Sequence, residues 1–372
     1  MNAVGVLLKY SLSLLLLCAF GAAAGCDWPA WQRYKQDYIS AGGRVIDPST
    51  PNRITTSEGQ SYGLFFALVA GDRPAFDRLL SWTEDNLAQG DLSARLPAWL
   101  WGENENKQWT VLDDNSASDS DLWIAYSLLE AGRLWDSRRY QTLGTLLLQR
   151  IAREEVADIP GLGPMLLPGK VGFVKDDGWR LNPSYLPPQL LARFAALRGP
   201  WQAMQQSNQR LWLETAPHGF SPDWVVWRKT QGWRADAAKP NVGSYDAIRV
   251  YLWAGMLADD DAHKAALVRR FQPMAQLTAQ QGVPPEKTDT ASGKTSGNGP
   301  VGFSAALLPL LAHQPEALAA QRQKIIDHPP GNDAYFSASL TLFGQGWDEQ
   351  RYRFNRQGEL QPSWDRQCAT SE

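Results

Sequence analysis

Residues 55–69, which read TTSEGQSYGLFFALV, decide the fold. Within them, apolar side chains recur at the i, i+3, i+4, i+7 spacing of one helix face, at Tyr62, Phe65, Phe66 and Val69. Glu58 stands in the first turn of this helix, and Ser57 with Gln60 fits a Ser-x-x-Gln capping box. The stretch therefore predicts a helix that begins near residue 57 and carries a carboxylate at its N-terminal end.

Helical spacing of this kind dominates the rest of the chain, and alternating strand patterns are few. It predicts about twelve helices, coarsely at 29–39, 57–70, 74–88, 119–134, 138–155, 185–198, 200–216, 244–257, 260–281, 302–314, 315–327 and 333–348. Long connections rich in Gly, Pro, Asn, Asp and Trp precede every second helix, whereas the other connections have only a few residues. A helical hairpin repeated about six times, with its long loops at one end, is typical of an α/α toroid. We therefore expect an all-α fold, an (α/α)6 barrel with long loops on one face and a shared mouth where the inner helices begin.

Residues 1–25 have the organisation of a secretory signal, with one positive charge before a leucine-rich run and a cluster of small residues. We expect this segment to be removed, which places the protein in the periplasm or outside the cell. The leucine-rich run is too short to span a membrane comfortably, and no other run comes near doing so. The remaining residues, 26–372, contain no low-complexity linker, so they predict one domain. Cys26 and Cys368 then lie at the two ends of this domain. Two alternatives stay open: a disulfide between the two cysteines, and lipidation of Cys26.

The charge and the motif content of the chain exclude several classes of function. A net charge of −3 over 372 residues provides no basic surface for nucleic acid. The histidines are far apart and none pairs at a metal-ligand spacing; they are His218, His263, His313 and His328. The sequence has no P-loop, no dinucleotide-binding fingerprint and no Gly-x-Ser-x-Gly motif. We therefore expect no nucleic-acid partner, no metal and no cofactor.

Tryptophan is the unusual component of the sequence, with 17 residues. Flat aromatic side chains pack well in a helical core and also against the apolar faces of sugar rings, so position decides between the two roles. The helical tryptophans are expected in the core: Trp82, Trp123, Trp135, Trp201, Trp212 and Trp253. Those of the long loops are the candidate sugar platforms: Trp99, Trp101, Trp109, Trp179, Trp224, Trp227 and Trp233. Trp101 is the first choice among them for substrate binding.

Acidic residues stand at the starts of three helices that follow long loops: Glu58, Asp119 with Asp121, and Asp246. Acids favour a first helical turn because of the helix dipole, so each of them could be purely structural. Their occurrence at three starts around one predicted mouth favours a shared site instead. Paired carboxylates facing a tryptophan-lined groove indicate glycoside hydrolysis, in which one protonates the leaving oxygen and the other is base or nucleophile. Because a helix N-terminus lowers a carboxyl pKa, burial and a neighbouring carboxylate must raise the pKa of the acid.

Four segments of the chain resemble glycoside hydrolase family 8. Residues 117–125, ASDSDLWIA, are similar to the family signature, with Ser120 where Ala or Gly is usual. Residues 57–63, SEGQSYG, resemble its general-acid segment, and residues 244–249, SYDAIR, resemble its catalytic-base segment. The run NPSY, residues 182–185, is similar to another segment of the site. The resemblance covers nearly the whole chain after the predicted signal.

This resemblance implies a single catalytic domain with inverting β-1,4-glucanase activity. It implies Glu58 as the general acid, Asp246 as the base that activates water, and Asp119 as the residue that holds the distorted sugar. Asp121 is a less favoured substitute for Asp119 in binding substrate. The other implied substrate-binding residues are Tyr185, Tyr245 and Arg249. Inversion requires the two reacting carboxyl groups to lie roughly 6.5–9.5 Å apart.

The expected substrate is a cellulose-type β-1,4-glucan. Residues 96–102 and 299–304 resemble members of the family associated with bacterial cellulose synthase, which implies trimming or editing of cellulose during its synthesis and export. A cellulose synthase export complex is then a candidate partner. Two alternatives stay open: a non-catalytic glucan-binding or secretion accessory, and an enzyme of the same fold that acts on xylan or chitosan. The presence of three acids together argues against the accessory.

Overall fold

A computed structural model describes residues 28–364 of the chain. The predicted signal segment 1–25 and both Cys26 and Cys368 lie outside the described residues, as do the rest of 1–27 and 365–372. Over residues 28–364, none of the helices combines the length and the apolar character needed to cross a membrane.

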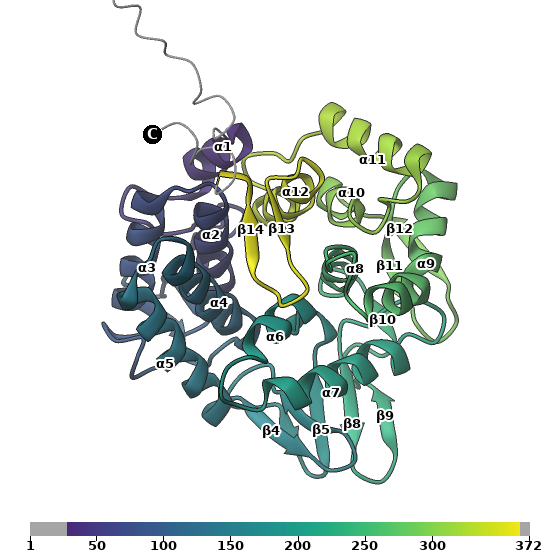
Figure 1. Cartoon of the computed structure of the whole chain (residues 1–372), viewed down its shortest axis with the longest axis horizontal. Coiled ribbons are helices and arrows are strands. Elements are labelled where there is room, and N and C mark those ends of the chain that lie inside the picture. The colour runs from purple at the N-terminus through teal and green to yellow at the C-terminus, as the bar shows by residue number, and fades with distance from the viewer. Residues whose placement is uncertain (1–27, 365–372) are drawn as a thin grey trace, which may run out of the picture.

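The described chain forms a double ring of helices (Figure 1). The inner helices are α2 (Ser57–Val69), α4 (Ser118–Leu134), α6 (Pro188–Phe194), α8 (Ile248–Gly255), α10 (Val301–Leu307) and α12 (Tyr335–Asp348). The outer helices are α1 (Pro29–Tyr38), α3 (Arg73–Leu87), α5 (Arg138–Glu154), α7 (Trp201–Glu214), α9 (Lys264–Gln281) and α11 (Pro315–Asp327). A 3-10 turn, η1 (Pro183–Tyr185), precedes α6. The (α/α)6 architecture predicted from the sequence is confirmed.

The burial pattern explains which helices lie inside. The inner helix α2 is buried all round, from Gly59 to Val69, as expected of a helix enclosed by others. The outer helix α5 buries one face only, at Tyr140, Gly144, Leu147, Leu148 and Ile151. These positions follow the i, i+4, i+7, i+8 spacing of a helix that packs on one side and meets solvent on the other.

Aromatic side chains fill the middle of the ring. The Trp123 ring on α4 lies 5.4 Å from the rings of both Trp253 on α8 and Phe343 on α12. Phe343 also lies 4.7 Å from Phe66 on α2, so the last inner helix closes the ring against the first. Four helical tryptophans predicted for the core are fully or almost fully buried: Trp123, Trp201, Trp212 and Trp253.

The long connections contain short strands that the sequence did not predict, so the fold is mostly helical and not purely so. Within residues 28–364 the strands are β1 (Thr55–Thr56), β2 (Leu100–Glu103), β3 (Trp109–Asp113), β4 (Val156–Ile159), β5 (Gly163–Leu166), β6 (Val174–Lys175), β7 (Gly178–Leu181), β8 (Val225–Arg228), β9 (Gly232–Ala235), β10 (Val242–Gly243), β11 (Pro285–Asp289), β12 (Thr295–Asn298), β13 (Tyr352–Phe354) and β14 (Leu360–Pro362). They form five small sheets, ordered β1-β2-β3, β4-β5, β6-β7-β8-β9, β10-β11-β12 and β13-β14. All pairings are antiparallel, and several join connections that are distant in sequence, such as β7 with β8.

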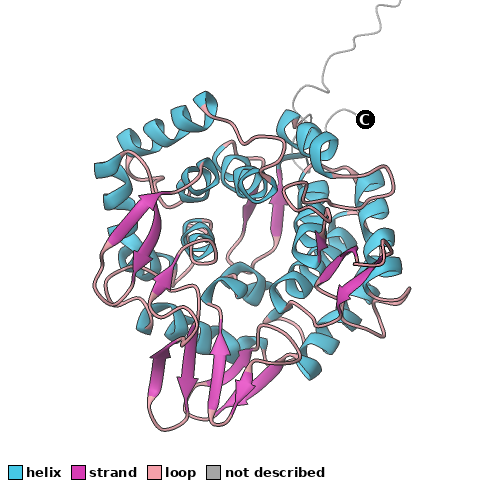
Figure 2. Cartoon of the chain, turned by 180° about the vertical axis from the view of Figure 1, so that it is seen from behind, coloured by secondary structure: helices cyan, strands magenta, loops and turns pink. Residues whose placement is uncertain are grey.

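The two faces of the ring are built differently. The long loops precede the inner helices, so their sheets surround the N-terminal ends of those helices, on the face turned to the viewer in Figure 2. The β13–β14 hairpin instead crosses the ring at the C-terminal ends of the inner helices (Figure 1). Trp364, just after β14, donates its indole N–H to the carbonyl of Leu68 near the end of α2. We call these the open face and the closed face.

A buried carboxylate fixes the hairpin to the closed face. Glu130, near the end of α4, is fully buried and accepts the backbone N–H of Leu360 at 2.8 Å. Its two carboxylate oxygens also accept from Arg193 at 2.5 Å and from Arg133 at 2.6 Å. Every oxygen of this carboxylate therefore has a charged partner, which is the condition for burying a charge without a large penalty.

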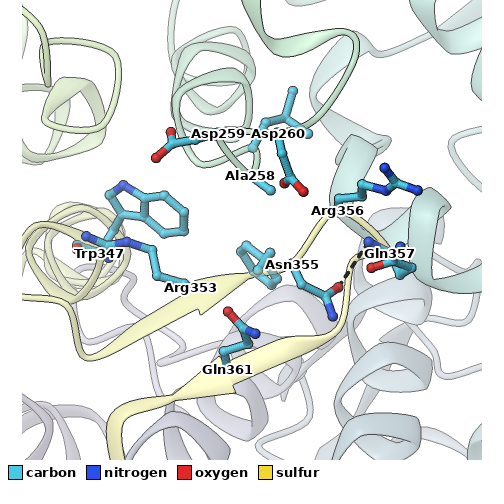
Figure 3. Close-up of a pocket in the computed structure, with 11 residues that line it drawn as sticks. Ala258, Asp259, Asp260, Trp347, Arg353, Asn355, Arg356, Gln357 and Gln361 are labelled. Carbon is cyan, nitrogen blue, oxygen red and sulfur yellow. Dashed lines mark hydrogen bonds between the residues drawn. The ribbon is translucent and has the colours of Figure 1, made fainter.

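A polar pocket of about 590 Å³ lies beside the hairpin on the closed face (Figure 3). Asp259 and Asp260, from the connection after α8, line one side of it, and Asn355 and Gln361 line the other. The Trp347 indole is part of the pocket wall. Trp347 is nevertheless buried, and the guanidinium of Arg353 lies 4.2 Å from its ring. The pocket is thus on the opposite face from the starts of the inner helices.

Candidate active site

Arg249 lies at the centre of three carboxylates on the open face. Its Nη1 donates to Glu58 Oε2 and to Asp119 Oδ2, the latter at 3.3 Å, and its Nη2 donates to Asp246 Oδ1 at 2.7 Å. The arginine side chain itself is only 4% exposed. The structure therefore brings together the three acids and the arginine that the sequence proposed for one site, although they are distant in the chain.

The N-terminus of α2 presents Glu58 in a way that differs from the predicted capping box. The cap is Thr56, whose Oγ1 accepts the Gly59 N–H at 3.1 Å. Gln60 instead points into the core, where it accepts from the Val45 N–H at 2.6 Å and donates to Thr83 at 3.0 Å. The predicted Ser57–Gln60 capping box is therefore wrong. The Gln60 side chain is used in the core instead, where the buried Val45 N–H and Thr83 hydroxyl would otherwise lack this partner. Glu58 is nevertheless left free of any capping role.

The surroundings of Glu58 suit a general acid. Burial raises the pKa of its carboxyl to about 7, against the neighbouring Arg249, and the charges of Asp119 and Asp246 add to the increase. The side chain is still 24% exposed, so a substrate can reach it. Burial therefore outweighs the attraction of Arg249, and the Glu58 carboxyl holds its proton up to about pH 7, the range that a general acid needs.

Asp246 lies in the turn just before α8, with each carboxylate oxygen held by a different donor. Arg249 donates to Oδ1, and the indole N–H of Trp224 donates to Oδ2 at 3.1 Å. The side chain is 23% exposed. Trp224 was expected to be a sugar platform, and its contact with the carboxylate could not be read from the sequence, because 22 residues separate the two.

The two aspartates at the start of α4 point to different surroundings. Asp119 accepts the Ser120 N–H at 2.8 Å and faces Arg249, and burial raises the pKa of its carboxyl despite that arginine. Asp121 is fully buried and lies beside Glu155, and burial together with that second carboxyl raises its pKa well above the usual range. This position corrects the expectation that Asp121 binds substrate.

Two tyrosines contact Arg249, and a third lies on the rim next to Asp246 in the chain. Tyr62, which the sequence placed only in the core stripe of α2, accepts from Arg249 Nη1 at 3.0 Å; its position one turn after Glu58 was the available signal. The ring of Tyr185 lies 5.8 Å from the Arg249 guanidinium. Tyr245 is 47% exposed and packs edge-on against Phe303 at 5.1 Å, on the rim. The predicted binding residues Tyr185 and Tyr245 thus lie at or above the charged cluster.

Trp101 lies on β2 beside the start of α2. It pairs in register with Thr55 of β1, three residues before Glu58. The Trp101 ring stacks with that of Trp109, with 5.3 Å between the ring centres, and the guanidinium of Arg44 lies 4.4 Å from the centre of the Trp101 ring. Because Trp109 is 47% exposed, the pair forms an aromatic surface next to the acid-bearing helix.

Not every loop tryptophan is available to a ligand. Trp227 is 7% exposed and donates its indole N–H to the Pro160 carbonyl at 3.0 Å, so it belongs to the core and the expectation that it is a platform is wrong. No group of three or more His, Cys, Asp or Glu side chains among residues 28–364 is arranged to hold a metal ion. The guanidinium of Arg249 occupies the space between the three carboxylates.

A carboxyl whose pKa is raised and a second carboxylate, both at the open face of an α/α ring, are the groups that a glycoside hydrolase uses. Residues 4–350 match the profile of glycosyl hydrolases family 8, and the chain belongs to this family. It is 59% identical over 368 residues to an endoglucanase of Escherichia coli (strain K12), a match that covers 99% of this chain and 100% of that protein.

Solved structures agree with this assignment. An endo-1,4-D-glucanase from Vibrio fischeri ES114 is 49% identical and superposes with a TM-score of 0.86, covering 91% of this chain and 99% of its own. An endo-β-1,4-glucanase from Acetobacter xylinum is 27% identical, with a TM-score of 0.71 over 87% of this chain and 97% of its own.

Proposed function

We propose that the protein is an endo-β-1,4-glucanase that hydrolyses cellulose-type glucan with inversion of the anomeric carbon. The observation that carries this proposal is one guanidinium, Arg249, shared between a carboxyl that keeps its proton to about pH 7, Glu58, and the two-donor carboxylate of Asp246. The activities named for the Escherichia coli and Vibrio fischeri relatives support the choice of substrate.

In the proposed reaction Glu58 gives its proton to the glycosidic oxygen while the bond from that oxygen to the anomeric carbon breaks. Asp246 takes a proton from a water molecule, whose oxygen attacks the anomeric carbon from the opposite face of the sugar. Asp119, buried beside Arg249, holds the distorted sugar ring. Arg249 keeps the acids at fixed positions and offsets part of their mutual repulsion.

We also propose that the enzyme works in the periplasm or outside the cell, where it trims cellulose during synthesis and export, with a cellulose synthase export complex as a partner. The signal-like segment 1–25 and the resemblance of residues 96–102 and 299–304 to cellulose-associated members support this proposal. Cell fractionation with and without 1–25 tests the location. Co-purification with the synthase proteins tests the partner.

The activity is tested by release of reducing sugar from carboxymethylcellulose, xylan and chitosan. The wild type is compared with Glu58→Gln and Asp246→Asn, which keep the shape of each side chain and remove its acid–base function. We expect cleavage of carboxymethylcellulose by the wild type alone, with products of inverted configuration in NMR spectra. Activity on xylan or chitosan instead would change the substrate, and binding without cleavage would favour the non-catalytic accessory.

A further inference from the structure

We propose that Asp223 and Trp224, neighbours in the connection before β8, form a clamp that fixes Asp246, one holding its backbone turn and the other its carboxylate. The inference rests on the proposed role of Asp246 as the base. Neither residue has to touch the substrate, so both are positioning residues.

The backbone half of the clamp is the buried carboxylate of Asp223. Its Oδ1 accepts the N–H of Ser244 at 2.7 Å and the N–H of Ala247 at 2.8 Å, so the two bonds bracket the turn that carries Asp246. Asp223 also donates its own N–H to the carbonyl of Val242 at 2.7 Å. With the Asp223 side chain 3% exposed, loss of the acceptor would leave two buried N–H groups without a partner.

The close approach of the two segments depends on Gly243. A Cβ at this position would lie 2.1 Å from the backbone oxygen of Ser221, which no side chain permits. The chain therefore uses glycine where residues 221–224 run against the turn before α8. Burial and the charge of Asp246 raise the pKa of Asp223 to about 6, so Asp223 is largely ionised at neutral pH. Besides Asp246, Lys239 is the charged group that faces it.

The side-chain half is the indole N–H of Trp224, which donates to Asp246 Oδ2. Because Arg249 holds Oδ1, the two donors fix the rotation of the carboxylate about its bond. The indole is itself held in place: the Arg180 guanidinium lies 3.7 Å from its ring, and the ring of Phe173 is parallel to it within 3° at 6.1 Å.

Further contacts connect this support to the rest of the open face. Arg180 is paired through two hydrogen bonds of 2.8 and 3.2 Å with Asp236, which is 4% exposed. The edge of Tyr185 meets the Trp224 ring at 5.9 Å. Trp224 is therefore packed between protein groups, and its distinguishing feature is the hydrogen bond to Asp246.

The chemical consequence follows from what a base must do. Asp246 has to hold a water molecule in line with the anomeric carbon, and misplacement of a reacting group by about 1 Å can cost about 10²-fold in rate. The clamp therefore acts on the catalytic step and not on the strength of glucan binding.

The first test is Trp224→Phe, which keeps an aromatic ring and removes the N–H. We expect kcat on a soluble cello-oligosaccharide to fall about 10- to 100-fold, the usual effect of one hydrogen bond to a charged group, with KM changed less than about twofold. The matched control is Trp31→Phe, which removes an indole N–H bonded at 3.0 Å to another carboxylate, that of Asp72 on the outer ring. Its kinetics should not change.

The second test uses the other half of the clamp. Asp223→Asn keeps an oxygen that can accept from Ser244 and Ala247, whereas Asp223→Ala removes it. We expect the kcat of the asparagine variant to lie within about fivefold of the wild-type value. The kcat of the alanine variant should be lower than that of the asparagine variant by a further factor of about ten or more. Circular dichroism spectra confirm that each variant is folded, and the Trp224→Phe result decides the proposal if the alanine variant does not fold.

Asp246→Asn is measured in the same series and separates the two possible failures. Its inactivity together with unchanged kinetics of Trp224→Phe would overturn the clamp and leave the base in place. Full activity of Asp246→Asn would remove both the base and the clamp. A raised KM for long glucans, with unchanged kcat in Trp224→Phe, would show that Trp224 is a sugar platform after all.

Discussion

Each face of the ring buries a cluster of opposite charges, but carboxylates are in excess on the open face and guanidinium groups are in excess on the closed face. On the open face one guanidinium, Arg249, is shared among three carboxylates. On the closed face one carboxylate, Glu130, is held by two guanidinium groups and a backbone N–H. The first cluster has more negative charge than its cation can balance, and the pKa of Glu58 rises to about 7 as a result of burial and its acidic neighbours. An excess of buried carboxylates raises a carboxyl pKa toward the range that acid catalysis needs, whereas an excess of cations around one carboxylate keeps it ionised and holds the hairpin in place.

The largest expected effect comes from removing an acid on the open face. Glu58→Gln should lower kcat by about 10²–10⁴-fold, the usual contribution of general acid catalysis. The free energy of unfolding should stay equal or increase, because a desolvated carboxyl among like charges is removed. Steady-state kinetics and urea unfolding measure the two quantities. A loss of stability comparable to a core substitution would show that the cluster is structural.

The reverse result is expected on the closed face. Glu130→Gln leaves Arg133 and Arg193 without their counter-charge and should lower the free energy of unfolding by about 2–3 kcal/mol. This loss of stability is smaller than that expected for a fully buried ion pair, because the Arg133 side chain is 34% exposed to solvent. The kcat of the folded variant should remain that of the wild type. A large fall in kcat with normal stability would mean that the hairpin influences the open face.

The pH dependence of activity and of stability distinguishes the open-face cluster further. Since the pKa of Glu58 is raised to about 7, kcat/KM should fall as the pH rises through 7, when the acid loses its proton. Protonation of Glu58 also favours the folded state. The stability of the wild type relative to Glu58→Gln should therefore decrease between about pH 4.5 and 7 and stay level above. Urea unfolding at several pH values checks this, and a constant difference would contradict it.

The smallest effect is expected at the aromatic surface of the open face. Trp101→Ala should lower kcat/KM for long cello-oligosaccharides by about 2–10-fold, the effect of one stacking contact, and change it little for short ones. The comparison requires oligosaccharides of increasing length at one enzyme concentration. An equal loss at every length would place Trp101 outside the binding surface, as support for the start of α2.

The helices could be predicted from the sequence because their apolar spacing is local. The predicted helix at 57–70 is α2, and even the predicted helix at 315–327 matches α11 residue for residue. The helix expected at 185–198 is shorter, because Pro187 and Pro188 delay its start until α6 begins at residue 188. Strands of two to five residues have too little alternation to be recognised, and their pairing partners lie in other loops.

The three acids and, through the family resemblance, Arg249 could be named from the sequence, whereas the contacts of Asp121 and Trp224 could not. Glu58, Asp119 and Asp246 follow from their positions at helix starts, and the structure places all three at Arg249. The orientation of Asp121 toward Glu155 depends on tertiary packing, which no local pattern records. The hydrogen bond of Trp224 to Asp246 depends on how one long loop folds over another.

The hairpin on the closed face has a consequence for how a polymer is handled. β13 and β14 lie across one end of the ring (Figure 1), and the Trp123 and Phe343 rings pack 5.4 Å apart between the inner helices. If the open face binds glucan as proposed, the hairpin covers the opposite end of the ring, and the chain would lie across the open face with both of its ends on that side. Such an arrangement needs no free chain end, so a bond far from either end of a long polymer is as accessible as one near it.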